Sequence, residues 1–243
     1  MRAFIFAKRN TKEILRDPLT YLFGIGFPIA LLLLLTAIQR NIPVPMFDLR
    51  KLVPGISVFS MSFLALFSAQ LAARDRGSSF LERLLTTPMR AADYIVGYIL
   101  PFLPMALLQS SAVAGTACLL GLPVSGKILL LIISLLPSAL LFICLGIALG
   151  NCMNEKQVGG ICGALLTNLS AWVSGIWFDP EMIGKGFARF CEFLPFIHSV
   201  RLGQFVLNDT TNALANELLW IGGYALAFML LSVLLFTGNM KQS

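Results

Sequence analysis

The sequence predicts an all-α membrane protein, and three observations carry that prediction. Hydrophobic residues make up 57% of the 243 residues and charged residues 12%, with a mean hydropathy of +0.83, which leaves too little polar surface for a soluble domain. The apolar residues also come in uncharged runs of about 20 residues, the length at which a helix crosses a bilayer. Finally, the basic residues behind the net charge of +6 lie at the ends of those runs, which favours membrane topology over nucleic-acid binding.

Residues 2–17 come before the first apolar run and mix basic side chains with apolar ones such as Phe4 and Ile14. This pattern predicts an amphipathic helix in the headgroup region that ends at Pro18. A simple positively charged flank is the alternative interpretation. Because the first apolar run is long enough to span and follows a charged segment, we expect no cleavable signal peptide.

Six apolar runs then predict six transmembrane helices within one domain over residues 1–243, and none of the runs contains Asp, Glu, Lys, Arg or His. Pro28 predicts a kink in the first run, and Pro101 and Pro104 predict a break in the third. The predicted spans cover residues 19–39, 52–73, 94–120, 128–150, 157–178 and 218–236.

Residues 179–216 differ from the runs on either side because charges alternate with phenylalanines throughout. No uncharged stretch here reaches the length needed to cross a bilayer. Pro195 divides the segment into two amphipathic pieces. We therefore expect two helices that lie in the outer interface, or dip part-way into it as re-entrant helices.

Six crossings would place both ends of the chain on the same side of the membrane. With both termini in the cytoplasm, the inner side carries eleven Lys and Arg residues and the outer side seven. This bias follows the positive-inside rule and predicts a multi-pass protein of the plasma membrane, the inner membrane in a bacterium with two membranes, with cytoplasmic termini.

A short helix is predicted inside the charged connector between the second and third spans. Ser79 and Glu82 form a capping box, and Thr87-Pro88 ends the helix because the residue before proline leaves helical geometry. About two helical turns cannot hold themselves in water, so this helix needs a surface to lie on. A capped loop helix at the membrane interface and a docking helix for a soluble partner both fit. Its apolar face comprises Phe80, Leu81, Leu84 and Leu85, while Glu82 and Arg83 point elsewhere.

The chain contains no evident source of driving energy. Spans without ionisable residues argue against a proton-driven carrier and against an intramembrane metalloenzyme. The run from Gly121 to Lys127 matches G-x-x-x-x-G-K, but Ile128 replaces the Ser or Thr that binds magnesium, and the preceding segment is a predicted membrane helix rather than a strand. We therefore expect no cofactor and no nucleotide in this chain.

Milder polar residues inside the spans allow two interpretations. Gln70, Gln109, Ser110 and Asn168 are expected either to form hydrogen bonds between helices or to line a substrate path. His198 has no carboxylate nearby in the sequence and is expected to pack at the interface. A cluster of Asp179, Glu181, Glu192 and His198 is the best basis for a different class of protein, a membrane-embedded lipid-modifying enzyme.

Several short motifs follow one another along the chain: Val53-Pro54-Gly55-Ile56, Glu82-Arg83-Leu84-Leu85-Thr86-Thr87-Pro88, Tyr94-Ile95-Val96-Gly97, Ser174-Gly175-Ile176-Trp177-Phe178, Leu194-Pro195-Phe196 and Val200-Arg201. In this order they resemble the membrane-spanning permease subunit of type-two ABC exporters. The resemblance covers nearly the whole chain, although the sequence departs from the family at Asp75–Ser78, where an acidic pair is common.

This resemblance implies a non-enzymatic transport subunit. Such proteins have an N-terminal interfacial helix, six spans, two outer re-entrant helices and a cytoplasmic coupling helix, here residues 77–88, bounded by Ser79 and by Thr87-Pro88. They work as homodimers or heterodimers with two copies of a separate ABC ATP-binding subunit, which carries ATP and magnesium. Apolar spans favour an amphiphilic small molecule as cargo, as in multidrug or antibiotic export. A lipid-linked polysaccharide, the lipid-modifying enzyme and a non-catalytic membrane scaffold remain alternatives.

Overall fold

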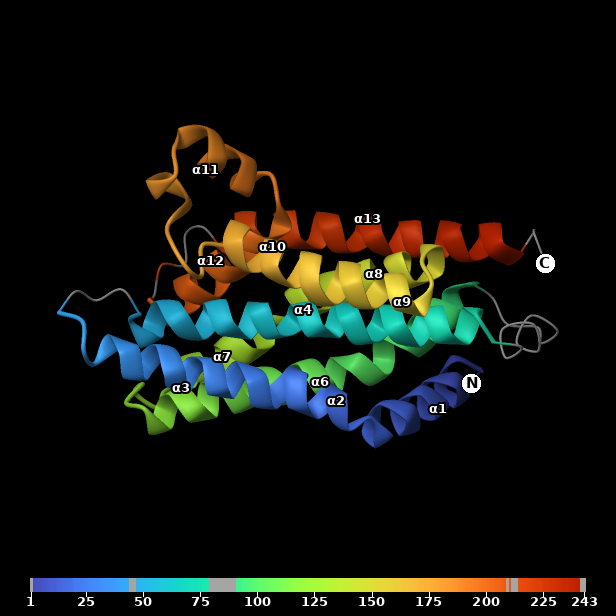
Figure 1. Ribbon diagram of the computed structural model, residues 1–243, viewed down its shortest axis with the longest axis horizontal. Helices are drawn as coiled ribbons and strands as arrows, with labels where there is room; N and C mark the ends of the chain where they lie inside the picture. The colour runs from blue at the N-terminus through green and yellow to red at the C-terminus, as the bar shows by residue number, and fades with distance from the viewer. Residues whose placement is uncertain (1, 44–46, 79–90, 209, 211–213, 241–243) are drawn as a thin grey trace.

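The computed structural model describes residues 2–43, 47–78, 91–208, 210 and 214–240, and the secondary structure in these ranges is helical, with no strand. Most of the helices run lengthwise in one bundle (Figure 1). In chain order the elements are α1 (Arg2–Arg16), α2 (Pro18–Tyr21), η1 (Leu22–Gly26), α3 (Phe27–Gln39), α4 (Leu49–Arg76), α6 (Ala91–Leu119), α7 (Gly126–Ser134), α8 (Leu136–Cys152), α9 (Glu155–Gly160), η2 (Ile161–Leu166), α10 (Thr167–Val173), η3 (Pro180–Met182), α11 (Lys185–Glu192), α12 (Pro195–Leu207) and α13 (Leu214–Met240).

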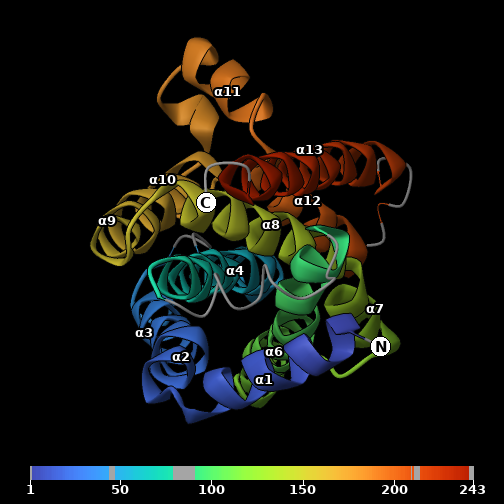
Figure 2. The same ribbon diagram turned by 90° about the vertical axis from the view of Figure 1, so that its right-hand side faces the viewer.

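Helix α4 is the centre of the bundle, and every residue from 52 to 69 is buried. It packs against α8, α6, α3, α12 and α9, which surround it in the bundle (Figure 2). Its start is fixed by Asp48, whose side chain accepts a hydrogen bond from the Arg50 backbone N–H. A helix buried on all sides over residues 52–69 is therefore the scaffold on which the helices around it are placed.

The closest helix contact joins α4 to α8 and depends on two glycines four residues apart. A methyl group on Gly146 would overlap the Ala65 carbonyl oxygen, and one on Gly150 would overlap the Ala69 carbonyl oxygen. The Ser68 hydroxyl lies within hydrogen-bond distance, 3.2 Å, of both the Ala65 and the Ile143 carbonyl oxygens, so it bridges the two helices. Small residues thus let these backbones approach, as is typical of helix pairs in membranes.

The prediction that prolines break the third span is wrong, because α6 continues through Pro101 and Pro104. Pro101 has no N–H and cannot donate to the Gly97 carbonyl one turn earlier. Asn10 of α1 occupies that carbonyl instead, its Nδ2 donating to the Gly97 oxygen at 3.0 Å. A neighbouring helix therefore supplies the hydrogen bond that proline removes.

Prolines in the first and fourth spans lie where the helix changes type or is interrupted by a single turn residue. In the first span, Pro28 follows the π-helical turn η1 and stands at the start of α3. In the fourth, a single turn residue, Leu135, separates α7 from α8, and Pro137 lies in the first turn of α8. The expectation of an N-terminal helix that ends before Pro18 is met, with Asp17 capping the next helix by accepting from the Leu19 N–H.

Five helical segments have the length and apolar composition of membrane spans: 18–39, 49–76, 91–119, 126–152 and 214–238. They correspond to all the predicted spans except the fifth, residues 157–178. There the helix formed by α9, η2 and α10 ends at Val173, five residues earlier than predicted, because Ser174 caps it and Gly175 turns the chain at φ +77°. Polar residues such as Gln157 and Asn168 lower the apolar character of this segment. The sixth crossing stays a prediction.

The segment between α10 and α13 forms η3, α11 and α12, and Pro195 begins α12 as the division at that residue suggested. Helix α11 stands away from the bundle (Figures 1 and 2). Helix α12 packs against α13, α4 and α7, with most of its residues buried. The two amphipathic pieces thus differ, because most of α12 is buried, whereas Cys191 is the one buried residue of α11.

Candidate functional site

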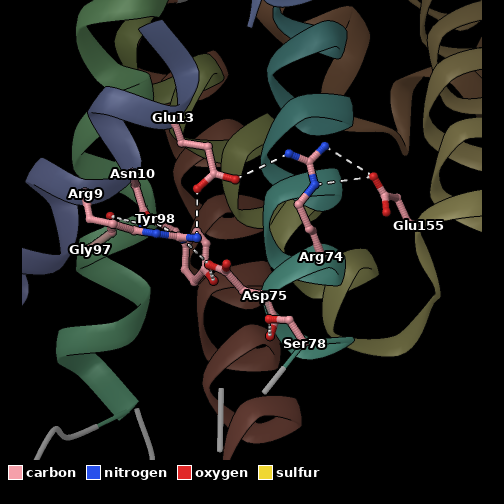
Figure 3. A network of polar contacts seen from close by, with 9 residues as sticks. All are labelled: Arg9, Asn10, Glu13, Arg74, Asp75, Ser78, Gly97, Tyr98 and Glu155. Carbon is pink, nitrogen blue, oxygen red and sulfur yellow. Dashed lines mark hydrogen bonds and ion pairs between the residues drawn. The ribbon is translucent and has the colours of Figure 1, made fainter. Parts of the chain in front are cut away.

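A network of polar side chains joins four helices at one end of the bundle, which Figure 3 shows from close by. It lies where α4 ends, immediately before the segment predicted to be the coupling helix. Helices α1, α6 and α9 reach the same place, and both the start of α1 and the end of α13 lie at this end of the bundle (Figure 1). The charge bias of the sequence predicts that this end faces the cytoplasm.

Asp75 is the centre of the network, with 1% of its surface exposed. One carboxylate oxygen, Oδ2, accepts hydrogen bonds from the Tyr98 hydroxyl of α6 at 2.5 Å and from Arg9 Nη1 of α1 at 2.7 Å. A buried carboxylate is costly unless it is paired and hydrogen-bonded, and here both conditions are met. The last turn of α4 is therefore fixed to α1 and α6 through a single side chain.

Helix α1 is held against α6 by packing and against α4 by charge. The Phe6 ring contacts the Tyr94 and Tyr98 rings at centroid distances of 5.8 and 5.0 Å, and it lies against Gly97, which has no side chain to obstruct it. Burial by itself would lower the pKa of Arg9, but its hydrogen bond to Asp75 and the charge of that carboxylate outweigh burial and raise the pKa above its ordinary value. Arg9 is therefore a permanent cation in this contact.

Arg74 extends the network to the surface and to α9. Its guanidinium contacts Glu13 of α1 at 3.3 Å and Glu155 of α9 at 3.2 Å, and about half of the Arg74 and Glu155 side chains is exposed. Exposed ion pairs of this kind contribute about 1 kcal/mol or less. Arg76 adds a stronger link, donating from Nη2 to the Met153 carbonyl at 2.6 Å, so both ends of the α8–α9 connection touch α4.

The predicted coupling helix falls almost wholly outside the described residues. The residues proposed to form this helix and its contacts all lie in the range 79–90, which the structure does not describe. They are Ser79, Phe80, Leu81, Glu82, Arg83, Leu84, Leu85, Thr87 and Pro88. The two residues before them are placed. Gly77 caps α4, with its N–H on the Ala73 carbonyl, and the Ser78 hydroxyl donates to the Asp75 carbonyl at 3.0 Å. The segment therefore starts one turn from Asp75.

The four residues proposed for a substrate path do not lie together. Gln70 is on α4, Gln109 and Ser110 are on α6, and Asn168 is on α10. Gln70 lies six residues from the Arg76 end of α4, whereas Gln109 lies eighteen residues from the same end of α6, which separates them by about 18 Å along the bundle. The structure does not bring the four to one surface of this chain, and their role stays a prediction.

The other interpretation of these polar residues is that they form hydrogen bonds between helices, and the structure shows few such bonds. Asn168 Nδ2 donates to the Ala164 carbonyl of its own helical run at 2.8 Å. Gln109 is fully buried beside Gly24, and within the described residues neither its amide nor the Ser110 hydroxyl has a hydrogen-bond partner. Serines outside the predicted set make the bonds between helices, since Ser232 of α13 donates to the Cys144 carbonyl of α8 at 3.0 Å.

His198 has a carboxylate partner that its sequence neighbourhood did not reveal. Nε2 donates to the Glu192 carbonyl oxygen at 2.9 Å, and Nδ1 forms a hydrogen bond with Glu217 Oε2 at the start of α13. Both side chains are almost wholly buried, and the imidazole stacks on the Trp220 indole. The structure shows a packing role for His198 that includes a buried polar pair joining α12 to α13, and its position at the membrane interface stays a prediction.

The residues suggested for a lipid-modifying enzyme are divided between two places. Asp179, Glu181 and Glu192 line a cleft of about 490 Å³, but His198 is not among its lining residues. Both ring nitrogens of His198 are engaged elsewhere, and Asp179 caps η3 by accepting from the Glu181 N–H. Within the described residues no group of three or more His, Cys, Asp or Glu side chains is placed to hold a metal. The cluster therefore lacks the base that the enzyme hypothesis requires.

Sequence reasoning did not find Arg9, Asn10, Asp75 and Tyr98 as a unit. The sequence alone marks Asp75 only as part of a departure from the family pattern, and it gives Arg9 no role beyond that of the other basic residues in 2–17. A usable signal was present, because Glu13 and Arg9 are four residues apart on one helical face, where an ion pair at 2.8 Å forms. Pairing across 66 residues between Arg9 and Asp75 has no such signal.

Comparison with known proteins adds one match. The family model described as ABC-2 type transporter matches residues 2–207, from α1 to the end of α12. The matched range contains the whole network around Asp75 as well as residues 79–90. No curated protein matches the chain.

Proposed function

Since this chain belongs to the ABC-2 type transporter family, we propose that it is the transmembrane permease subunit of an ATP-driven exporter. It crosses the plasma membrane six times with both termini in the cytoplasm, as the charge bias favours. It acts as a homodimer, or as a heterodimer with a related permease, together with two copies of a separate ABC ATP-binding subunit. ATP and magnesium bind that partner, and this chain catalyses no reaction.

The observation that carries the proposal is the position of Asp75 directly before the coupling segment. A buried carboxylate ties the end of α4 to α1 and α6, and Arg76 ties it to the α8–α9 connection. A displacement applied at residues 79–88 therefore reaches four other elements through the last turn of α4. Because α4 is buried along its length and packs tightly against α8, it transmits such a displacement as a rigid rod.

In this mechanism ATP binding pushes the coupling helix and shifts the spans. Phe80, Leu81, Leu84 and Leu85 anchor that helix, while Glu82 and Arg83 contact the ATP-binding subunit. The shift opens a path along the dimer interface, and the energy comes wholly from the partner. The spans need no charge relay for this, in agreement with apolar runs that lack ionisable residues.

Copurification tests the proposal directly. The chain, tagged and expressed with its neighbouring genes, should retain an ABC ATP-binding subunit in roughly equal amount after detergent extraction. Purified chain without that subunit should neither hydrolyse ATP nor move solute. Transport by the chain alone would contradict the assignment, and so would a coupling segment that external protease cleaves in intact cells.

Replacing Glu82 with lysine should reduce transport and the stimulated ATPase rate in reconstituted membranes, because it reverses a charge at the proposed contact. Bringing like charges together across an interface costs several kcal/mol, so a loss of at least about tenfold is expected. The matched control is Glu181→Lys, which reverses the charge of an exposed glutamate in η3, far along the chain from the coupling segment. Equal transport by the two variants would remove Glu82 from the mechanism.

Two classes of cargo fit this mechanism. Apolar spans favour an amphiphilic small molecule, drug or antibiotic. One observation favours the alternative of a lipid-linked polysaccharide: Trp220, Tyr224 and Phe228 of α13 and the nearby Phe193 form a series of ring contacts, and Trp220 and Tyr224 line a cleft of about 380 Å³. Aromatic faces are suited to sugar rings. Trp220→Ala should impair polysaccharide export and leave drug export unchanged if the second cargo is correct.

A further inference from the structure

Helix α1 presents three distinct faces, and only one of them is covered by the bundle. Phe6, Asn10 and Ile14 are buried against the neighbouring helices, chiefly α6. Phe4 and Leu15 lie on a second face and are 66% and 62% exposed. The third face is basic and is formed by Lys8, Arg9, Lys12 and Arg16. In Figure 2, which looks along the bundle, α1 lies across the end of α6.

Two clefts of opposite character adjoin α1 and meet at the same two lysines. The first has a volume of about 760 Å³ and is lined by five basic and two acidic side chains, with Pro18 and Ile5 at its edge. The second, of about 600 Å³, is almost wholly apolar and lies between α1, Tyr21 and α6, with Leu100 and Leu108 among its lining residues. Lys8 and Lys12 line both. A charged space and an apolar space therefore share one rim.

The charges in the basic cleft are not equally engaged. Arg9 pairs with Asp75 and Glu13, and Arg74 pairs with Glu13 and Glu155. The other acidic lining residue, Asp17, caps α2 by accepting from the Leu19 N–H. In the described part of the chain, Lys8, Lys12 and Arg16 form no ion pair, so three cations at the rim are available to an anion.

We propose that this double cleft binds one anionic phospholipid from the cytoplasmic leaflet. Its headgroup phosphate contacts Lys8 and Lys12, with Arg16 close by, and one acyl chain lies in the apolar cleft against α6. Charge complementarity next to an apolar surface favours an anionic lipid over other ligands, because a soluble anion would use only the first cleft and a neutral lipid only the second. A basic, amphipathic helix at a membrane surface attracts anionic lipids in the same way.

Such a lipid would support the site described above. It would contact the basic face of α1 while Arg9, on that same face, holds Asp75. The lipid would thereby fix the orientation of α1 relative to the last turn of α4. This proposal goes beyond transport and does not depend on it, since it requires only that α1 lie at the membrane surface.

The test compares lipid affinity in wild-type protein and in the double variant Lys8→Gln/Lys12→Gln. Full-length protein in detergent is titrated with dioleoyl phosphatidylglycerol, dioleoyl phosphatidylcholine or sodium phosphate, and bound lipid is counted by native mass spectrometry. We expect the wild type to retain one phosphatidylglycerol and the double variant to bind it about 25-fold more weakly, from about fivefold for each lysine near an anionic surface. Raising the salt concentration should reduce the difference.

Controls separate charge from folding. Lys156→Gln removes an exposed lysine at the same end of the bundle and should leave phosphatidylglycerol affinity unchanged. Lys8→Arg/Lys12→Arg should retain it, and all variants should unfold at the wild-type temperature in phosphatidylcholine. Equal affinity of the double variant and wild type would overturn the proposal. Equal binding of phosphatidylcholine would reduce the site to an apolar groove, and inorganic phosphate that displaced the lipid completely would make it a soluble-anion site, so either result also overturns it.

Discussion

Replacing Asp75 with alanine should destabilise the protein more than any other single charge removal at this end of the bundle. The carboxylate is 1% exposed and accepts hydrogen bonds from both Tyr98 and Arg9. Its loss leaves the Tyr98 hydroxyl and part of the Arg9 guanidinium without an acceptor, and breaking a buried pair in this way costs about 3–5 kcal/mol. The measurement is the midpoint of thermal unfolding in detergent, together with transport in reconstituted membranes.

A matched exposed pair provides the control. Glu155→Gln removes a partner of Arg74, but about half of each side chain is exposed, so the cost should be about 1 kcal/mol or less. Tyr98→Phe should fall between the two, since it removes one hydrogen bond to a charged acceptor, worth about 1.5–3 kcal/mol, and leaves the Asp75 carboxylate paired with Arg9. If Asp75→Ala and Glu155→Gln lowered the midpoint equally, the network would be a surface feature and could not carry force.

Function should respond to Asp75→Ala beyond the loss of stability. In the proposed mechanism this carboxylate carries motion from the coupling segment to α1 and α6. Partial rescue of folding, for example by added lipid or lower temperature, should therefore leave ATP hydrolysis by the partner poorly coupled to transport. Full recovery of transport in the refolded variant would show that Asp75 has a structural role only.

The sequence contained enough information for the helices but not for their contacts. Residues 2–16 form the predicted amphipathic helix because charged and apolar side chains alternate at helical spacing there. Long apolar runs predicted five segments that the structure shows as long apolar helices. The run at 157–178 was placed by its lack of charge alone, so the turn produced by Gly175 at its end was missed.

Contacts between distant residues account for what could not be predicted. Pro101 indicated a break, and only the position of Asn10 against the Gly97 carbonyl shows why α6 continues. His198 appeared isolated because Glu217 follows nineteen residues later, on α13, which packs against α12. In both cases the prediction used only neighbouring residues in the sequence, and a residue from another helix changed the structure that resulted.

Replacing Gly146 with alanine should have the second large effect, on the contact between α4 and α8. Alanine is the better helix former by about 1 kcal/mol, so propensity alone predicts a gain in stability. The added methyl group would instead overlap the Ala65 carbonyl oxygen, which belongs to the backbone and cannot rotate away. Forcing an extra group into a packed contact costs about 1–3 kcal/mol, so the sign should reverse and the unfolding midpoint should fall.

Gly222→Ala in α13 is the matched control, because nothing lies within 4 Å of the position where its methyl group would stand. That variant should keep or slightly raise the midpoint. A fall for Gly222→Ala as large as that for Gly146→Ala would mean that backbone freedom, not close packing, is what the glycines provide. The contact between α4 and α8 also matters for transport, because the Cys144 carbonyl of α8 accepts a hydrogen bond from Ser232 of α13. Separating α8 from α4 should therefore uncouple α13 from any motion that begins at the end of α4.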